Sequence, residues 1–235
     1  MAKTVGYACS IKLSWLKRAY DMLEENYDDE SFKNELNHYL AFEIDSPTRL
    51  RKTREILMNI WYYENESISE IRNEACSLIK KYPEQFVAVS LCLIYIAYPV
   101  VADICKYMGR LFETHDEITN AMLKQKLYDT WGERGTLETT ARRVTLTLKE
   151  LGIISETKRT RYCLIKSELT NNDVISFILS VAMRIDNGSY YSFSELGEFD
   201  VLFPFEFIVS KEHILTDKNF MTTHFAGEMT ISLRE

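Results

Sequence analysis

The sequence predicts a mainly α-helical protein of the α+β type, with an N-terminal helical bundle, a central winged helix-turn-helix and a small C-terminal region that contains strands. Three observations support this class. The 235 residues include only 8 Gly and 4 Pro, which favours long elements over many tight turns. Apolar residues recur at helical spacing up to about residue 186. Phe and other β-favouring residues become frequent only after residue 190.

Residues 1–113 are expected to form the helical bundle. Its helices are predicted at 11–25, 31–42, 47–62, 67–81, 83–98 and 99–113. Ser46 and Pro47 are a typical helix start, with the N-cap followed by Pro at the first helical position. Ser67 and Glu70 have the spacing of a capping box. The fifth helix lies in the uncharged segment 86–102, and we interpret it as the buried centre of the bundle.

The same uncharged segment permits a membrane anchor as an alternative. It is short for a bilayer span, and it contains Pro99 and several polar side chains, so the buried helix is favoured and no membrane contact is expected. The first ten residues lack the apolar core of a secretory signal. The five Cys are widely spaced, as is typical of free thiols in a reducing cytoplasm. We therefore expect a cytoplasmic location.

Residues 114–169 are expected to form the winged helix-turn-helix. A first helix is predicted at 116–131, and Thr136 is a suitable N-cap for a second helix that Gly152 ends. The second helix has one apolar stripe: Leu137, Ala141, Val144, Leu148 and Leu151. Strands are predicted at 153–155 and 162–165, joined by a basic turn. This order is typical of a winged helix, in which a helix enters the DNA major groove and the wing touches the backbone. The alternative is an ordinary amphipathic helix before an unrelated hairpin.

The candidate DNA-binding residues of this region are mostly cations. Those on the helix are Thr139, Arg142, Arg143 and Lys149, and those on the wing are Lys158, Arg159 and Arg161. Guanidinium groups suit phosphate oxygens and guanine edges. The neighbouring Thr140, Thr145 and Thr147 are further candidates, because a hydroxyl can donate to a phosphate and a methyl can contact thymine.

A second basic cluster opens the helix predicted at 47–62. It consists of Arg49, Arg51, Lys52 and Arg54. Cations in the first turns of a helix oppose the macrodipole, at a few tenths of a kcal/mol each, which indicates a partner for them. That partner is either the acidic run at residues 21–30, which is favoured by its closeness in sequence, or nucleic acid.

The net charge of −7 is unevenly distributed. Residues 185–235 carry nine acidic and three basic residues, whereas residues 136–166 carry seven basic and three acidic ones. The local charge matters more than the total for nucleic-acid binding. The four His are dispersed, no metal-ligand spacing occurs, and no catalytic or nucleotide-binding motif is present. We expect no enzyme activity, no cofactor and no metal.

Residues 170–235 are expected to hold a helix from Asn171 or Asn172 to about Asp186, followed by a β-containing tail. A strand is predicted at 199–209, and a terminal hairpin at 220–225 and 229–233. This acidic, aromatic tail is either a structural cap or a surface for a protein partner.

Several of these segments resemble the BrxA family of bacterial BREX phage-defence systems. The resemblance rests on Tyr7-Ala8, on Ser46-Pro47-Thr48-Arg49 with the cations that follow, on Thr140-Ala141-Arg142-Arg143 and on Leu148-Lys149-Glu150-Leu151-Gly152. It extends to about residue 185. It implies a NusB-like N-terminal bundle, a winged-helix-like part and non-enzymatic binding of double-stranded DNA. Arg49, Arg51, Lys52, Arg54, Arg142, Arg143 and Lys149 are the residues that it marks.

The leading hypothesis is therefore a DNA-binding accessory protein of a phage-defence system, with other defence proteins as further partners. About six neutralised phosphates would make log affinity fall with log salt at a slope of about −5. Weak sequence preference is expected, because the helix offers no Asn or Gln to read adenine. The alternative is a protein-interaction adaptor in a multi-subunit defence complex that does not bind DNA directly.

Overall fold

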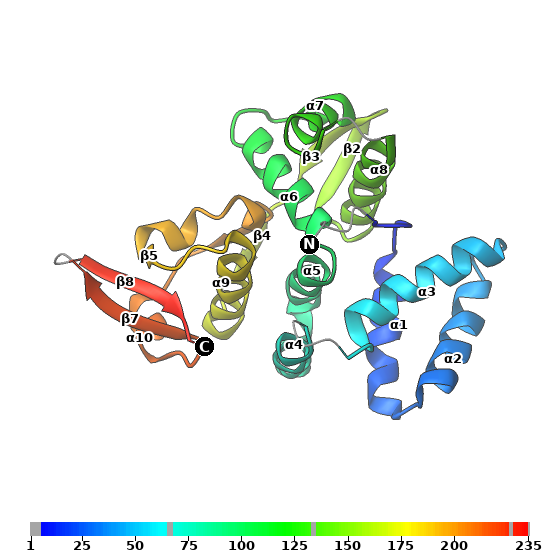
Figure 1. The fold of residues 1–235 in the computed structure, drawn as a ribbon, viewed down its shortest axis with the longest axis horizontal. Coiled ribbons are helices and arrows are strands. Elements are labelled where there is room, and N and C mark those ends of the chain that lie inside the picture. Colours follow the sequence, from blue (N-terminus) through cyan, green and yellow to red (C-terminus); the bar gives the residue numbers. More distant parts are fainter. Residues whose placement is uncertain (1–5, 65–67, 133–134, 226–227, 235) are drawn as a thin grey trace.

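The computed structural model describes residues 6–64, 68–132, 135–225 and 228–234, and the chain is a mainly helical α+β protein (Figure 1). The N-terminal half contains α1 (Leu13–Asp21), η1 (Met22–Glu25), α2 (Asp29–Ala41), α3 (Pro47–Trp61), α4 (Ser69–Lys81), η2 (Pro83–Gln85), α5 (Phe86–Ala97) and α6 (Pro99–Phe112). The middle contains β1 (Ile118–Thr119), α7 (Asn120–Trp131), α8 (Gly135–Glu150), β2 (Ile154–Lys158) and β3 (Arg161–Leu164). The remainder contains β4 (Ser167–Leu169), α9 (Asn172–Asp186), β5 (Tyr191–Ser192), η3 (Ser194–Gly197), η4 (Asp200–Leu202), β6 (Phe205–Phe207), α10 (Lys211–Thr216), β7 (Phe220–Phe225) and β8 (Glu228–Leu233).

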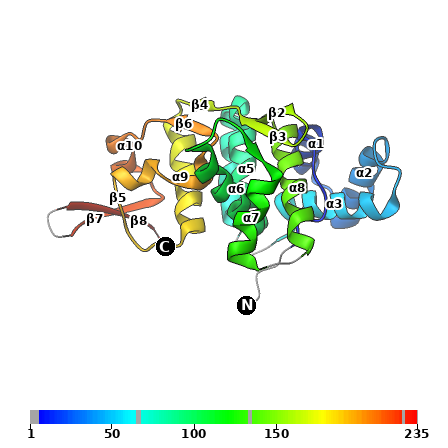
Figure 2. The same ribbon diagram turned by 90° about the horizontal axis from the view of Figure 1, so that it is seen from above.

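Helix α5 is the centre of the molecule. It packs against α3, α4, α6 and α9, and Figure 2 shows it with α6 between the α1–α3 group and the C-terminal region. From Phe86 to Tyr95, every residue except Val87 is buried. A helix enclosed on all sides has no face left for polar residues. Its apolar sequence is thereby explained, and the predicted buried helix is confirmed.

The uncharged segment 86–102 forms parts of two helices. α5 ends at Ala97, α6 begins at Pro99, and the two axes are bent by 119°. Pro at the first position of α6 needs no hydrogen-bonded N–H there. No single helix in the described part of the chain is long and apolar enough to cross a membrane.

Local capping explains the helix starts in the N-terminal half. The Asp28 carboxylate accepts from Ser31 N at 2.8 Å, so α2 begins two residues earlier than predicted. The Ser46 hydroxyl accepts from Arg49 N at 3.4 Å and confirms the predicted start of α3. The predicted capping box involves Ser67, which lies outside the described residues.

The chain from α6 to β3 forms three helices and a small antiparallel sheet of order β1-β3-β2. The prediction of one helix at 116–131 was wrong at its start. Ile118 pairs with Tyr162 and Thr119 with Arg161 in the sheet, and the Thr119 hydroxyl then caps α7 by accepting from Met122 N at 3.3 Å. The prediction that Thr136 is an N-cap was also wrong, because α8 already begins at Gly135.

The C-terminal region packs on α6 and α9. The η4 segment lies against α6, where a side chain at Gly109 would collide with the Asp200 carbonyl. The predicted strand at 199–209 was wrong in part: residues 200–202 form η4, and only Phe205–Phe207 is a strand, parallel to β4. Pro204 has no N–H for a longer ladder. The helix capped by Asn171 and the terminal hairpin are confirmed, and β8 also pairs with β5.

The predicted domain boundary at residue 113 passes through a continuous core. Helix α6 packs against α5 on one side and against α7, α8 and β1 on the other. The division into 1–113, 114–169 and 170–235 therefore stays a prediction about sequence segments. In space, α6 belongs to both of the first two.

Candidate nucleic-acid interface

Helix α8 is amphipathic, as its sequence predicts. The apolar stripe is buried: Leu137, Ala141, Val144, Leu148 and Leu151 are each at most 5% exposed. Thr139, Arg142, Leu146 and Lys149 lie on the exposed side. We call these four residues, together with the β2–β3 hairpin, the hairpin surface. Figure 1 shows β2 beside α8, and the two elements are in contact.

The prediction that Thr140, Thr145 and Thr147 contact nucleic acid was wrong. All three are at most 2% exposed. The Thr147 hydroxyl lies 3.1 Å from Tyr7 Oη and accepts from Ile11 N at 3.1 Å. The segment that precedes α1 thus lies across one side of α8, which the spacing of the threonines alone did not indicate.

Arg143 is also partly used inside the protein. It is half-buried, and its Nη1 donates to the Tyr7 carbonyl at 3.2 Å. Arg142, one position away, is exposed and has no hydrogen-bond or ion-pair partner among the described residues. The two adjacent arginines therefore differ: Arg142 is available to a ligand, whereas Arg143 helps to hold the N-terminal segment on α8.

The β2–β3 hairpin has a two-residue tip, Arg159-Thr160, between the paired Lys158 and Arg161. Thr160 has a φ of +67°, which is rare for a β-branched residue. Lys158 and Arg159 are exposed, and neither forms a hydrogen bond or ion pair with any described residue. The tip therefore presents two unneutralised cations to solvent.

Two carboxylates form ion pairs with cations of the hairpin surface, and the sequence did not predict these pairs. Glu117 accepts from Thr157 Oγ1 at 2.8 Å and from Arg161 Nη1 at 3.3 Å, and these two bonds lower its pKa. Glu156 accepts from Lys149 Nζ at 2.6 Å, which lowers the pKa of Glu156 and raises that of Lys149. Arg161 and Lys149 are thus neutralised in the unbound protein.

The basic cluster of α3 is largely unpaired. Arg49, Arg51 and Lys52 are exposed and have no ion pair with any residue in the described part of the chain. Only Arg54 is held, by Glu55 at 2.5 Å and by Asn37 Oδ1 at 3.3 Å. The favoured explanation, pairing with the acidic run at 21–30, was therefore wrong. Arg18 binds the Glu25 carboxylate of that run instead, at 3.0 Å.

We call Arg49, Arg51 and Lys52 the α3 surface. The pKa of nearby Lys12 is raised chiefly by its hydrogen bond to Glu43; the charge of Glu150 at the end of α8 raises it further and that of Arg49 lowers it. In both ribbon views the α1–α3 group lies on the same side of the molecule as α8 (Figures 1 and 2).

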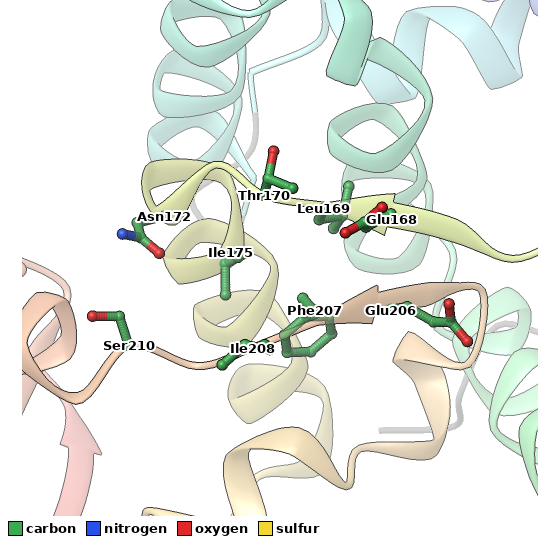
Figure 3. A pocket seen from close by; sticks show the side chains of 9 residues that line it. All are labelled: Glu168, Leu169, Thr170, Asn172, Ile175, Glu206, Phe207, Ile208 and Ser210. Carbon is green, nitrogen blue, oxygen red and sulfur yellow. The ribbon is translucent and has the colours of Figure 1, made fainter.

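A hollow of about 500 Å³ lies in the C-terminal region, where β4 and β6 diverge. Figure 3 shows Ile175 of α9 behind it, with Phe207, Ile208 and Glu206 along β6 and the segment that follows. Ile208 is 86% exposed. Glu206 binds Lys166 at 2.7 Å, and Glu168 pairs with Glu206 in the strand register. This hollow is apolar with an acidic edge.

Among the described residues, no group of three or more His, Cys, Asp or Glu side chains is arranged to hold a metal. The expectation that no cofactor and no metal is needed stays a prediction. Comparison of the chain with protein-family models, with curated proteins and with solved structures found no match. The geometry of the chain itself must therefore carry any functional conclusion.

Proposed function

We propose that this chain binds double-stranded DNA chiefly through the hairpin surface, with the α3 surface as a second contact to the backbone, without catalysing a reaction. The observation that carries the proposal is that two adjoining elements expose cations without an ion-pair partner in the described chain: Arg142 on α8, and Lys158 and Arg159 at the hairpin tip. Like charges exposed on one surface repel one another. An anionic ligand that spans the helix and the tip removes this repulsion, and the DNA backbone has the required charge spacing.

The order of elements supports the same proposal. Helix, short strand, two helices and a two-stranded hairpin, with sheet order β1-β3-β2, is the order of a winged helix. In that unit the helix before the hairpin, here α8, enters the major groove. The exposed residues of α8 then face the bases, and the hairpin tip contacts phosphates. Arg161 and Lys149 join the contact when their carboxylate partners release them.

Weak sequence preference follows from the side chains on this face. Arg142 can read guanine, and Lys149 can do so once Glu156 releases it, whereas Thr139 hydrogen-bonds without strong base preference and Leu146 can only contact a thymine methyl. With one guanidinium available for base edges, most of the affinity is electrostatic and independent of sequence. A random-sequence selection that yields one sharp consensus would contradict this part of the proposal.

The biological setting is proposed on the family resemblance alone. Similarity to the BrxA family suggests an accessory role in a BREX phage-defence system, with other defence proteins as partners. The NusB-like description of the N-terminal bundle has the same basis. The proposal of DNA binding rests on the exposed cations and does not depend on the family resemblance.

The direct test is a mobility shift with double-stranded DNA, single-stranded DNA and RNA probes of the same sequence at two salt concentrations. The proposal predicts a shift of the duplex that weakens strongly at higher salt. No shift of any probe at low salt would contradict it.

A protein-interaction adaptor is the second candidate. The observation in its favour is the C-terminal hollow with the exposed Ile208 beside the Glu168 and Glu206 pair. An apolar anchor with a basic flank would suit such a surface. This function would be favoured over DNA binding if a pull-down retains a protein partner after nuclease treatment and the mobility-shift assay shows no binding of the duplex.

A further inference from the structure

A hollow of about 640 Å³ lies between α2 and α3, next to the α3 surface. Its lining combines three kinds of side chain. The apolar part contains Ala41, Ile44, Pro47 and Leu50; the polar part contains Asn34, Asn37, His38 and Asp45; and the cationic part contains Arg51 and Arg54. Carboxamides, an imidazole ring and guanidinium groups next to apolar side chains are the groups that recognise an extruded nucleobase.

An exposed aromatic pair stands at the edge of this hollow. Phe42 is 78% exposed, and its ring lies edge-to-face with that of His38, with 5.3 Å between centroids. Phe42 directly follows the last residue of α2, and the sequence alone did not predict that its ring would be exposed. Single exposed rings are common on protein surfaces, but this ring contacts His38, which lines the hollow, so a flat ligand bound there would also cover Phe42. A nucleobase is a flat group of suitable size that can stack on such a ring.

The carboxamides have unused hydrogen-bonding capacity. Asn34 is exposed and has no partner among the described residues. Asn37 uses only its carbonyl oxygen, which accepts from Arg54 Nη1 at 3.3 Å, so its two N–H donors stay available. Arg54 is itself fixed by Glu55. The Asn37 amide is thus held in place with its donors unused, as is needed to bind the edge of an unpaired base.

The charge around the hollow suits a phosphate. Arg51 lines it, and Arg49 and Lys52 are on the same first turns of α3 without ion-pair partners in the described chain. Asp45 is the opposing charge, and its carboxylate can accept from an exocyclic amino group of a base. A nucleotide places an aromatic base and an anionic phosphate side by side, which matches this distribution.

We propose that the α2–α3 hollow binds an unpaired nucleotide of single-stranded DNA, with the base stacked on the exposed ring of Phe42 beside His38 and the phosphate held by Arg51. This inference rests on the proposed duplex binding, since the hollow adjoins the α3 surface and the α1–α3 group lies on the same side of the molecule as α8 (Figures 1 and 2). The protein would then hold DNA where a duplex adjoins a single-stranded stretch. Asn34 and Asn37 would contact the edge of the stacked base.

The test compares three labelled DNA probes by fluorescence anisotropy with the full chain: a blunt duplex, the same duplex with a five-nucleotide single-stranded overhang, and the single strand alone. A stacked base contributes about 1–3 kcal/mol, so the overhang should raise affinity at least about fivefold over the blunt duplex. Phe42→Ala and Asn34→Ala should remove this gain and leave blunt-duplex affinity unchanged. Phe42→Trp should keep the gain, with quenching of the new tryptophan by the overhang.

Tyr190→Ala is the matched control, because it removes another exposed ring, 66% exposed, in a different region. Equal affinity of the wild type for blunt and overhang probes would overturn the inference while leaving duplex binding intact. A gain that survives Phe42→Ala, or one that Tyr190→Ala removes equally, would also overturn it. If no blunt duplex binds but the single strand still binds in a Phe42-dependent way, the duplex proposal fails and the nucleotide site stands.

Discussion

The hairpin surface and the α3 surface are both cationic, yet they are neutralised to different degrees. On the hairpin surface, Glu117 holds Arg161 and Glu156 holds Lys149. On the α3 surface, all three cations lack an ion-pair partner among the described residues. On the first surface, Arg161 and Lys149 can therefore bind an anion only after their internal ion pairs break. The second has full charge in the unbound state, at a cost to the stability of its own helix.

The largest effect is expected from charge reversal on the hairpin surface. The triple change Arg142→Glu, Lys158→Glu and Arg159→Glu removes three phosphate contacts and adds repulsion, so duplex affinity should fall at least about 100-fold at moderate salt. Anisotropy with a labelled duplex measures this. The matched control reverses Lys17, Lys211 and Lys218, which are exposed cations outside both surfaces. An equal loss in the control would contradict a localised interface.

A smaller loss of affinity with a gain of stability is expected from the α3 surface. Arg49→Gln, Arg51→Gln and Lys52→Gln together should weaken duplex binding about tenfold. The same variant should unfold in urea with a free energy higher by a few tenths of a kcal/mol per site, because the cations oppose the dipole of α3. Unchanged or lower stability would show that the cluster has internal partners in solution.

A gain of affinity is expected when a neutralising carboxylate is removed. Glu117→Gln releases Arg161, so duplex affinity should rise a few-fold and the salt slope should steepen by up to about 0.9. The change also affects acid stability. Since the pKa of Glu117 is lowered in the folded state, its pairing stabilises the fold above the ordinary carboxyl pKa, and this contribution is lost as pH falls through the lowered value.

The effect on acid stability is tested by unfolding the wild type and Glu117→Gln at about pH 7 and about pH 3. The wild type is expected to lose more stability on acidification. The corresponding change Glu156→Gln releases Lys149 and should act in the same direction. An affinity lower than that of the wild type in both variants would mean that the carboxylates position the hairpin and do not compete with DNA.

The smallest effect is expected at the hairpin tip. Thr160→Gly removes the steric cost of φ +67° and should raise the free energy of unfolding by about 0.5–1 kcal/mol. Thr160→Ala is the control, because it keeps a Cβ and so retains most of the strain. Equal stabilisation by both changes would rule out backbone strain as the cause.

Local sequence patterns predicted most helices and strands. Contacts between residues far apart in sequence determine which side chains are exposed to a ligand. The stripe from Leu137 to Leu151 and the start of α3 at Ser46-Pro47 follow from spacing and capping, which depend only on neighbours in sequence. Strand β1 was not predicted because two residues are too few to show a periodic pattern. Its pairing partners are also distant in sequence: Ile118 pairs with Tyr162, 44 positions away. The burial of Thr147 under Tyr7 has the same kind of cause.

The sequence identified the candidate cations, but it did not show which carboxylates form ion pairs with them. Sequence proximity suggested that residues 21–30 neutralise the α3 cluster, whereas the fold directs Arg18 to Glu25 and leaves Arg49 facing solvent. Glu117 was interpreted as part of a helix start, and it instead accepts from Arg161 at the start of β3. Charge partners depend on tertiary packing, so a single sequence identifies candidates without showing which are free.

We expect six cations without an ion-pair partner in the described chain to meet the DNA backbone: Arg142, Lys158, Arg159, Arg49, Arg51 and Lys52. A salt titration of duplex affinity measures how many of them do so. With about six phosphates contacted, log affinity should fall with log salt at a slope of about −5, and the hairpin-surface triple variant should reduce the slope to about half of that. A wild-type slope near zero, or a slope that the triple variant leaves unchanged, would contradict the account.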